Sequence, residues 1–314
     1  MATDTLIAVE HLFRWYGTTC AVNDLSFEVR RGEVLGFLGP NGAGKSTTMQ
    51  VITGNLAPSA GRVTINGIDI LEQPKAAKAS LGYLPEQPPV YREFTVDEYL
   101  RFCARLNRIE RAGIHQAVER AKERCGLEQV GRRLIGNLSK GYQQRVGIAQ
   151  AIIHQPDVVI LDEPTVGLDP IQIREIRALI RELGKDHSVI LSTHILPEVQ
   201  ATCTRVQIIN RGELVLSDSI DGLAWRMQSS SLLIGLRAAP APALLADIAG
   251  VHAAEQVDPH RIRVQHDPGE NPAEAIAERA VREGWGLFEL TPERRSLEDI
   301  FVDITTTEAE EAAA

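Results

Sequence analysis

The sequence predicts an α/β protein whose core follows a segment of antiparallel strands, carries a helical insert and precedes a small α+β domain. Two observations carry this prediction. The continuously apolar run Val34–Leu38 leads into a glycine-rich loop, and apolar runs at Val158–Leu161 and Val189–Leu191 flank a helical segment. Such alternation of strand and helix is typical of an α/β core. At 314 residues the chain has room for two domains of roughly 100–200 residues each.

The first part of the chain has the periodicity of β-strands. Between Ile7 and Val34 the apolar residues alternate, so antiparallel strands are expected there. The run Arg62–Ile65 precedes Asn66-Gly67, a dipeptide that favours a tight hairpin turn. A further strand is predicted at Leu81–Leu84.

The period changes to helical between about residues 95 and 155, which predicts a helical insert. This insert begins with a capping box formed by Thr95 and Glu98. The parallel sheet then resumes at Val158, and a further helix is expected from Asp169-Pro170 to near Gly184.

A second domain is predicted after about residue 225. Its element order is βαββαβ, which suggests a ferredoxin-like or related sandwich. The predicted strands are Leu232–Leu236, His252–Val257, Arg261–Gln265 and Gly286–Leu290, with helices at about 241–249 and 273–283. The small, acidic last residues predict a disordered tail. The predicted domains are 1–227, with the insert at about 95–155, then 228–305 and the tail 306–314.

The composition excludes several classes of protein. A net charge of -9 argues against a nucleic acid as the main partner, because non-specific affinity for phosphate backbones needs a basic surface. The 4 cysteines have no metal-ligand spacing, which predicts reduced thiols in a cytoplasmic protein. The N-terminus lacks a signal-peptide pattern, and no apolar stretch approaches the ~20 residues of a spanning helix.

The segment Gly39–Ser46 has the pattern G-x-x-x-x-G-K-S. Its glycines let successive backbone N–H groups turn toward phosphate oxygens at a helix N-terminus. Lys45 would neutralise the β- and γ-phosphates, and the Ser46 hydroxyl would help to hold Mg²⁺. A chance glycine-rich turn is the alternative, but the buried strand before it and the helix after it favour phosphate binding.

Asp162 and Glu163 follow an apolar run and are expected at the carboxyl end of a core strand, where open α/β sheets bind ligands. Asp162 suits a Mg²⁺ shell, and Glu163 suits the activation of water. An acidic pair of this kind is often no more than the end of a strand, so its interpretation depends on the glycine-rich loop.

The segment Leu138–Arg145 begins a helix for which Ser139 is the predicted N-cap. Its hydroxyl and the neighbouring N–H groups could meet an anion, or they could serve as an ordinary cap. The residues alone leave both interpretations open.

In their order, these motifs resemble those of the ABC ATPase family over about residues 6–220. The resemblance implies that Tyr16 stacks on adenine and that Gln87 reaches the metal and water. It also implies that Asp169 lies in the loop that crosses to an opposing subunit, and that His194 contacts the γ-phosphate. Without the resemblance, Tyr16 would be read as a surface aromatic residue and Gln87 as a polar loop residue. Asp169 would be read as a helix cap and His194 as a structural histidine.

The resemblance thus implies a complete site for ATP and Mg²⁺. The catalytic set is Lys45, Gln87, Glu163 and His194, and the metal set is Ser46, Gln87 and Asp162. The nucleotide-contacting set is Tyr16, Gly39, Asn41, Gly42, Gly44, Lys45, Ser46, Thr47, Ser139, Gly141 and Asp169.

The signature departs from the family's commonest form, Leu-Ser-Gly-Gly-Gln. Lys140 replaces the first glycine and Tyr142 the glutamine, whereas Ser139 and Gly141 are retained. Together with Thr193–Val199 and Ser296–Phe301, this form resembles the export-type branch of bacterial ABC ATPases, and most closely the gliding-motility-associated ATPase group. That resemblance leaves the transported substrate open.

The family's architecture implies a homodimer in which two ATP molecules are bound between Gly39–Ser46 of one chain and Ser139–Gly141 of the other. It implies polytopic membrane permease subunits as partners, docked between Gln87 and about Arg101, and a cytoplasmic, peripheral location on the cell membrane. One alternative is a soluble ABC ATPase that acts on the ribosome or DNA. Another is a regulatory role in which the C-terminal domain binds a small ligand and gates the ATPase.

Overall fold

The computed structural model describes residues 5–227, 231–267 and 270–293 of the chain, which separates into two compact units, Met1–Ile220 and Asp221–Ala314. Helix α8 (Ile220–Met227) begins at this division. The tail predicted at 306–314 and the Ser296–Phe301 motif lie outside the described residues.

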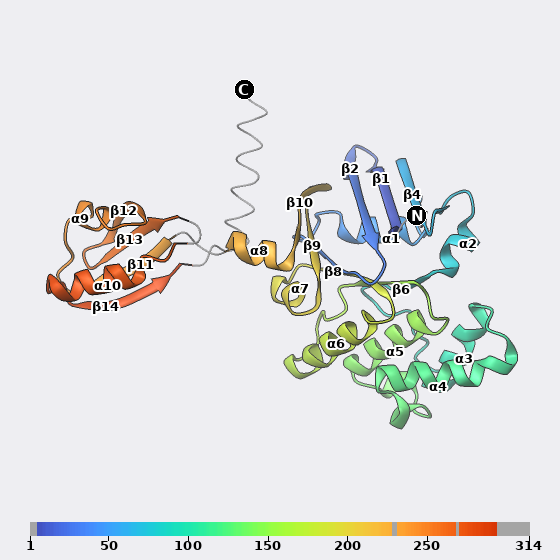
Figure 1. Ribbon diagram of the computed structural model, residues 1–314. Helices are drawn as coiled ribbons and strands as arrows, with labels where there is room; N and C mark the ends of the chain where they lie inside the picture. Colours follow the sequence, from blue (N-terminus) through green and yellow to red (C-terminus); the bar gives the residue numbers. More distant parts are fainter. Residues whose placement is uncertain (1–4, 228–230, 268–269, 294–314) are drawn as a thin grey trace. The chain divides into compact units, whose positions relative to one another are not determined.

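An antiparallel sheet with the strand order β2-β1-β4-β5 begins the first unit (Figure 1). Its strands are β1 (Thr5–Tyr16), β2 (Thr19–Arg30), β4 (Ala60–Ile65) and β5 (Ile68–Asp69). The predicted antiparallel strands are confirmed. The hairpin at Asn66 and Gly67 is confirmed too, with φ values of 51° and 75°, because a type I′ turn needs positive φ at both central residues.

A second sheet of the same unit has the order β10-β9-β3-β8-β7-β6. Its strands are β3 (Val34–Leu38), β6 (Leu81–Leu84), β7 (Val158–Asp162), β8 (Ser188–Thr193), β9 (Arg205–Asn210) and β10 (Glu213–Ser219). Neighbours from β9 to β6 are parallel, and β10 is antiparallel to β9. Strands β3, β7 and β8 are buried throughout, as continuous apolar runs predict for parallel strands covered on both faces.

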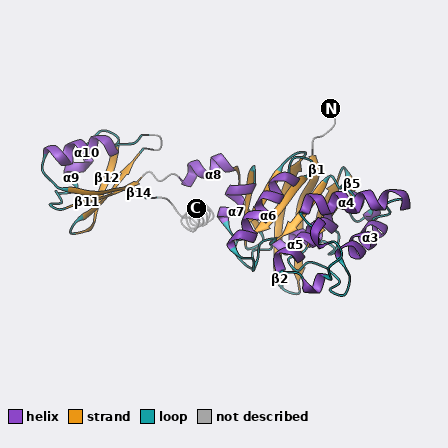
Figure 2. Cartoon of the chain, turned by 90° about the horizontal axis from the view of Figure 1, so that it is seen from below, coloured by secondary structure: helices purple, strands orange, loops and turns teal. Residues whose placement is uncertain are grey.

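Helices cover this sheet, and Figure 2 shows α5 and α6 along its strands. The helices are α1 (Lys45–Ile52), α2 (Pro74–Ala79), α3 (Val96–Leu106), α4 (Ile114–Cys125), α5 (Lys140–Ile152), α6 (Pro170–Leu183) and α7 (Leu196–Thr202), with 3₁₀ turns at Arg111–Gly113, Glu128–Val130 and Ile135–Asn137. The predicted capping box is present at the start of α3, where the Thr95 side chain and Glu98 exchange hydrogen bonds with each other's backbone N–H.

Two hydrophobic cores hold the first unit together. One joins the antiparallel sheet, α1 and one face of the parallel sheet, and it includes Leu12, Phe37 and Met49. The other joins the parallel sheet to the helical insert and α6, and it includes Leu161 and Ile148. Both faces of β3, β7 and β8 are therefore packed, and this packing holds the carboxyl ends of the three strands in place relative to one another.

The second unit is a four-stranded antiparallel sheet with the order β12-β13-β11-β14. Its elements are β11 (Ser231–Leu236), α9 (Ala243–Ala246), β12 (Val251–Asp258), β13 (Arg261–His266), α10 (Ala273–Arg282) and β14 (Leu287–Pro292). The predicted βαββαβ order is confirmed, in a ferredoxin-like arrangement. Helix α9 is shorter than the predicted 241–249: it begins after Pro242 and ends at Ala246.

Across the three described ranges, no helix combines the length and the apolar character that crossing a bilayer requires.

Candidate nucleotide-binding and hydrolysis site

The carboxyl ends of three neighbouring parallel strands bring the sequence motifs together. β8 lies between β3 and β7, with Leu38 opposite Thr193 and Asp162 opposite Ser192. The glycine-rich loop follows β3, Glu163 follows β7 and His194 follows β8. Residues more than 100 positions apart in the sequence therefore share one edge of the sheet, where open α/β sheets bind ligands.

The glycine-rich loop has a backbone that glycine alone accommodates. Gly42 and Gly44 have φ values of 81° and 103°. A Cβ atom on Gly44 would lie 2.4 Å from the carbonyl oxygen of Ala21, and one on Gly39 would lie 2.3 Å from that of Ile209. The close backbone packing holds the loop at the N-terminus of α1, where N–H groups without helical partners favour anions.

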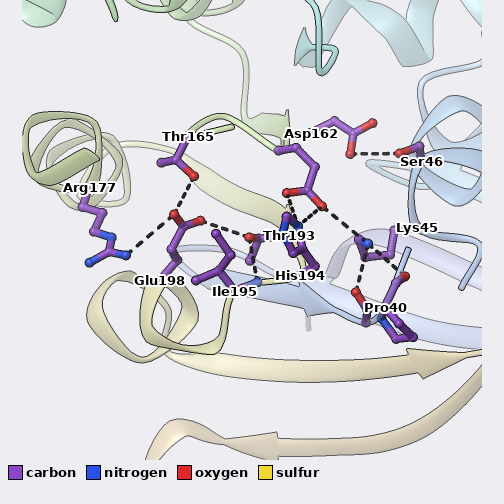
Figure 3. Close-up of polar contacts among 12 residues, drawn as sticks. Pro40, Lys45, Ser46, Asp162, Thr165, Arg177, Thr193, His194, Ile195 and Glu198 are labelled. Atoms are coloured by element: carbon purple, nitrogen blue, oxygen red, sulfur yellow. Dashed lines mark hydrogen bonds and ion pairs between the residues drawn. The ribbon is translucent and has the colours of Figure 1, made fainter. Parts of the chain in front are cut away.

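Lys45 lies beneath this loop and is almost fully buried. Its Nζ atom donates hydrogen bonds to the carbonyl oxygens of Gly39, at 3.0 Å, and Pro40, at 3.2 Å. Figure 3 shows the Lys45 side chain beside Pro40, with dashed lines marking its contacts. Lys45 is thus held as a fixed positive charge at the floor of the loop.

Asp162 and Ser46 form an oxygen-rich pair beside Lys45 (Figure 3). The Ser46 hydroxyl donates to Asp162 Oδ1 at 3.3 Å. Burial raises the pKa of Asp162, because desolvation disfavours the charged carboxylate, and the nearby Glu163 and Glu86 carboxylates raise it further. A hydroxyl and a carboxylate are hard oxygen donors, and a divalent cation would offset this concentrated negative charge. The pair therefore fits Mg²⁺.

Glu163 lies between Lys45 and His194. One of its carboxylate oxygens is 3.4 Å from Lys45 Nζ, and the His194 Nδ1 atom lies 3.0 and 3.1 Å from the two carboxylate oxygens. The Glu163 backbone has φ 47°, a left-handed conformation uncommon for a side chain of this size, and its N–H donates to Ser192 O at 2.9 Å. Such strain persists where surrounding structure imposes it.

These groups line one open cavity of about 370 Å³. The lining residues are Ala21, Asn41, Gly42, Gly44, Lys45, Ser46, Thr47, Glu86, Glu163, Val166 and His194. The structure thus gathers most of the predicted phosphate-contacting and catalytic residues around a volume whose walls carry Lys45, Glu163 and His194.

Gln87 and Tyr16 do not line this cavity, and Gly39 and Asp162 also lie outside its lining. Gln87 is exposed, and the preceding residue, Glu86, lines the cavity instead. Tyr16 is 47% exposed at the end of β1, and the Arg14 guanidinium lies 4.7 Å from its ring centroid. The family resemblance implies Gln87 as the site residue, whereas Glu86 lines the cavity. The turn after β6 decides which of the two faces the site.

The signature residues and Asp169 also lie away from the cavity lining. Ser139 caps α5 by accepting a hydrogen bond from the Tyr142 N–H, and Asp169 caps α6 by accepting from the N–H groups of Ile171 and Gln172. A Cβ atom on Gly141 would lie 2.7 Å from the Gln172 side chain, so the two helix starts are in close contact. Within one chain, Ser139 and Asp169 have the structural role of helix caps.

Comparison with known proteins gives the same family that the motifs indicate. A profile described as ABC transporter matches residues 22–166. The bacitracin transport ATP-binding protein BcrA of Bacillus licheniformis is 33% identical, over 96% of this chain and 97% of that protein. The chain belongs to the ABC transporter ATP-binding protein family. This ATP-binding subunit hydrolyses ATP to power transport.

Further relatives agree with this assignment. The probable multidrug ABC transporter ATP-binding protein YbhF of Escherichia coli is 34% identical, over 70% of this chain and 38% of that protein. The solved structure of cbiO1 from Clostridium perfringens, described as part of the ABC transporter complex cbiONQ, is 30% identical and has a TM-score of 0.65, over 70% of this chain and 91% of that one. These relatives are transporter proteins, so the alternative of an ATPase that acts on the ribosome or DNA is not supported.

Proposed function

We propose that this subunit hydrolyses ATP at the cavity between the glycine-rich loop and Glu163. The observation that carries the proposal is the approach of Lys45, Glu163 and His194 to one another on the cavity wall. Glu163 orients a water molecule and accepts its proton during in-line attack on the γ-phosphate. Lys45 and His194 stabilise the negative charge that develops on the transferred phosphoryl group.

The Ser46 hydroxyl and the Asp162 carboxylate are the groups that would hold Mg²⁺. Mg²⁺ held there would supply positive charge that neutralises part of the charge of the phosphates. The raised pKa of Asp162 supports this assignment, because a buried carboxylate gains most from a nearby cation.

The active unit is a homodimer with two shared sites. In this proposal, Ser139 and Gly141 of one chain face the phosphates bound by Gly39–Ser46 of the other. Two features support it: the signature residues do not line the cavity of their own chain, and Ser139 opens α5, whose N-terminus favours an anion. The Asp169 loop lies next to the signature and would cross the same interface.

The transporter that this subunit powers is an exporter. Support comes from the names of its relatives, a bacitracin transport protein and a probable multidrug transporter. The subunit would be held on the cytoplasmic face of the membrane by a polytopic permease. Assignment to the gliding-motility-associated group stays a prediction from the motif forms and says nothing of the substrate.

The variant Glu163→Gln tests the catalytic proposal. The amide keeps the shape of the side chain but cannot accept the proton of water, so we expect turnover to fall by roughly 10²–10⁴-fold, the typical contribution of general-base help. Affinity for ATP should persist, because the glycine-rich loop and Lys45 are intact. Initial rates of phosphate release and equilibrium binding of ATP measure the two effects. Hydrolysis at the parent rate would show that Glu163 has another role.

The same variant tests the partners, because it should trap the ATP-bound dimer. Tagged Glu163→Gln protein would be purified with ATP from detergent-solubilised native membranes, and the bound proteins identified by mass spectrometry. We expect a stoichiometric polytopic membrane protein, together with a subunit ratio of two ATP-binding chains per complex. Recovery of a second, different ATP-binding chain would contradict the homodimer.

A further inference from the structure

Glu198 is a carboxylate with no role in the chemistry proposed above, yet it is buried beside the site. It lies on α7 and is 1% exposed. Figure 3 shows its two oxygens directed at side chains from three other segments. Burying a charge is costly unless it is paired and hydrogen-bonded, so its partners determine why it is tolerated there.

The partners of Glu198 come from the two segments that carry Glu163 and His194. The Thr165 hydroxyl, two residues after Glu163, donates to Glu198 Oε1 at 2.5 Å. The Thr193 hydroxyl, one residue before His194, donates to Oε2 at 3.0 Å. Both threonines are buried, at 3% and 0% exposure. One carboxylate thus joins the loop after β7 to the end of β8.

Arg177 and the backbone of Ile195 complete the network. Arg177 on α6 lies 3.6 Å from Glu198 Oε1 and compensates its charge from the helix that Asp169 caps. The Thr193 hydroxyl also accepts a hydrogen bond from the Ile195 N–H at 3.1 Å, which fixes the chain immediately after His194. The network therefore spans the segments after β7 and β8 and the helix that begins at Asp169.

The site needs such support, because Glu163 has a left-handed backbone and touches His194 through side chains alone. Neither a strained residue nor an exposed histidine keeps its position without constraints from its neighbours. The two hydroxyl donors are attached at fixed distances along the chain from Glu163 and His194, so a shift of either segment would break one hydrogen bond of Glu198.

We propose that Glu198 is a positioning residue that sets the alignment of Glu163 with His194 for ATP hydrolysis. The inference rests on the roles proposed above for these two residues. The hydrogen bonds of Thr165 and Thr193 to Glu198 hold the segments that carry Glu163 and His194. The positive charge of Arg177 offsets the cost of burying the Glu198 carboxylate. Glu198 does not line the cavity, and its hydrogen-bond and ion-pair partners Thr165, Thr193 and Arg177 do not line it either, so we expect Glu198 to contribute to the rate of the chemical step and not to the binding of ATP.

The test compares the full-length chain with the variants Glu198→Ala, Thr165→Val and Thr193→Val. We expect kcat to fall by up to about 100-fold, the scale of a misplacement of about 1 Å in a catalytic group, with KM for ATP unchanged. Thr165→Ser and Thr193→Ser restore the hydroxyls and should restore kcat. Should Glu198→Ala fail to fold, the threonine variants carry the test, because each removes one hydroxyl and keeps the branched shape.

Glu33→Gln is the matched control, because Glu33 is also a mostly buried carboxylate paired with an arginine, Arg205, but it lies just before β3, at the opposite end of this strand from the glycine-rich loop. Its kcat should equal that of the parent chain. A kcat for Glu198→Ala and Thr193→Val equal to that of Glu33→Gln would overturn the inference, as would serine variants no more active than the valine variants. Glu163→Gln is measured alongside these variants to separate the two proposals. If the Glu198 inference is overturned while Glu163→Gln is inactive, the proposed function stands and only the inference fails. If Glu163→Gln is fully active, the proposed function itself fails.

Discussion

At the residue scale, Asp162 shows how the site is built at the expense of stability. It is 2% exposed at the end of β7, and burial raises its pKa above the ordinary value for an aspartate. A raised folded-state pKa means that the protonated form favours the folded chain, and that this stabilisation is lost as the pH rises through the folded pKa. Near neutral pH the charged carboxylate is therefore a destabilising group until a cation approaches it.

Asp162→Asn should consequently stabilise the chain and impair its activity. The amide keeps the shape without the buried charge, so we expect a higher urea midpoint than the parent near pH 7 when Mg²⁺ and nucleotide are left out. The difference should shrink as the pH falls through the folded-state pKa of Asp162, where the parent carboxyl is protonated too. Urea unfolding at several pH values measures this, with Mg²⁺-dependent ATPase assays expected to show loss of turnover. A lower midpoint for Asp162→Asn at pH 7 would contradict the argument.

Glu86 and Gln87 show how one position along the chain changes the chemistry of the site. Its neighbour Gln87 has the residue type that the family resemblance implies, but the turn after β6 leaves Gln87 exposed and places Glu86 on the cavity. Both residues are exposed in the bend that follows β6, and the course of this bend decides which of them lines the cavity. A shift of one position therefore exchanges an amide for a carboxylate at the site.

At the scale of elements, α6 connects the chemistry to the rest of the core. It begins with the Asp169 cap and Pro170 at its first position, as predicted, and it buries Ile176, Leu179 and Ile180. Its start is in contact with the signature helix α5 through Gln172 and Gly141. One helix thus carries a cap, the charge partner of Glu198 and a contact to the signature.

Substitution of Asp169 separates its two predicted roles. Asn is as good an N-cap as Asp, whereas Ala removes the cap at a cost of about 1 kcal/mol of folding free energy. We expect Asp169→Ala to lower the urea midpoint and Asp169→Asn to leave it unchanged. If Asp169 also acts across a dimer interface, Asp169→Asn should still reduce the ATPase rate. If Asp169→Asn has the stability and the ATPase rate of the parent chain, Asp169 acts only as the cap of α6.

At the scale of the whole molecule, we expect a permease to dock on a groove of the helical insert. A groove of about 600 Å³ is lined by Glu93, Phe94, Glu98, Arg101, Phe102 and Arg105, on and before α3. Next to it Tyr91 is 47% exposed, with its ring 5.8 Å from that of Phe102. The groove overlaps the surface between Gln87 and Arg101 that the sequence predicts as the dock, and aromatic residues with arginine are typical of interface anchors.

Reversing the charge at Arg101 and Arg105 together tests this surface. We expect Arg101→Glu with Arg105→Glu to abolish transport in cells and co-purification with the permease, while the isolated subunit keeps its basal ATPase rate. The rate should persist because neither arginine lines the nucleotide cavity. Arg111→Glu with Arg120→Glu, which changes the charge elsewhere on the insert, is the control. Normal transport by the first variant would exclude the groove as the dock.

The second unit is the part of the chain that would gate the ATPase if the regulatory alternative holds. The candidate catalytic and nucleotide-contacting residues all lie within Met1–Ile220. We therefore expect deletion of residues 228–314 to leave ATP binding and basal hydrolysis intact, as initial rates and equilibrium binding would show. A changed ATPase rate or a loss of dimerisation, measured by light scattering with ATP, would instead favour a gating role for this unit.

The sequence by itself determined the main strands and helices and the positions of the motifs at their ends. Continuous apolar runs predicted β3, β7 and β8, and fixed spacings predicted the phosphate loop, the acidic pair and the caps of α3, α5 and α6. These features are local, because a buried strand, a glycine turn and a cap each depend on a few consecutive residues. Local patterns of this kind can be recognised before anything is known of the fold.

Only the tertiary structure decided which residues meet. The contact of Glu163 with His194, the choice of Glu86 over Gln87, and the joining of Thr165 and Thr193 by Glu198 all depend on strand order and on the turns after β6, β7 and β8. Distances between segments far apart in the chain are set by packing on both faces of the sheet, which no local spacing specifies. Glu198 belongs to the Thr193–Val199 segment that resembles the family, but no role was assigned to it from the sequence, and its burial among partners from other segments distinguishes it.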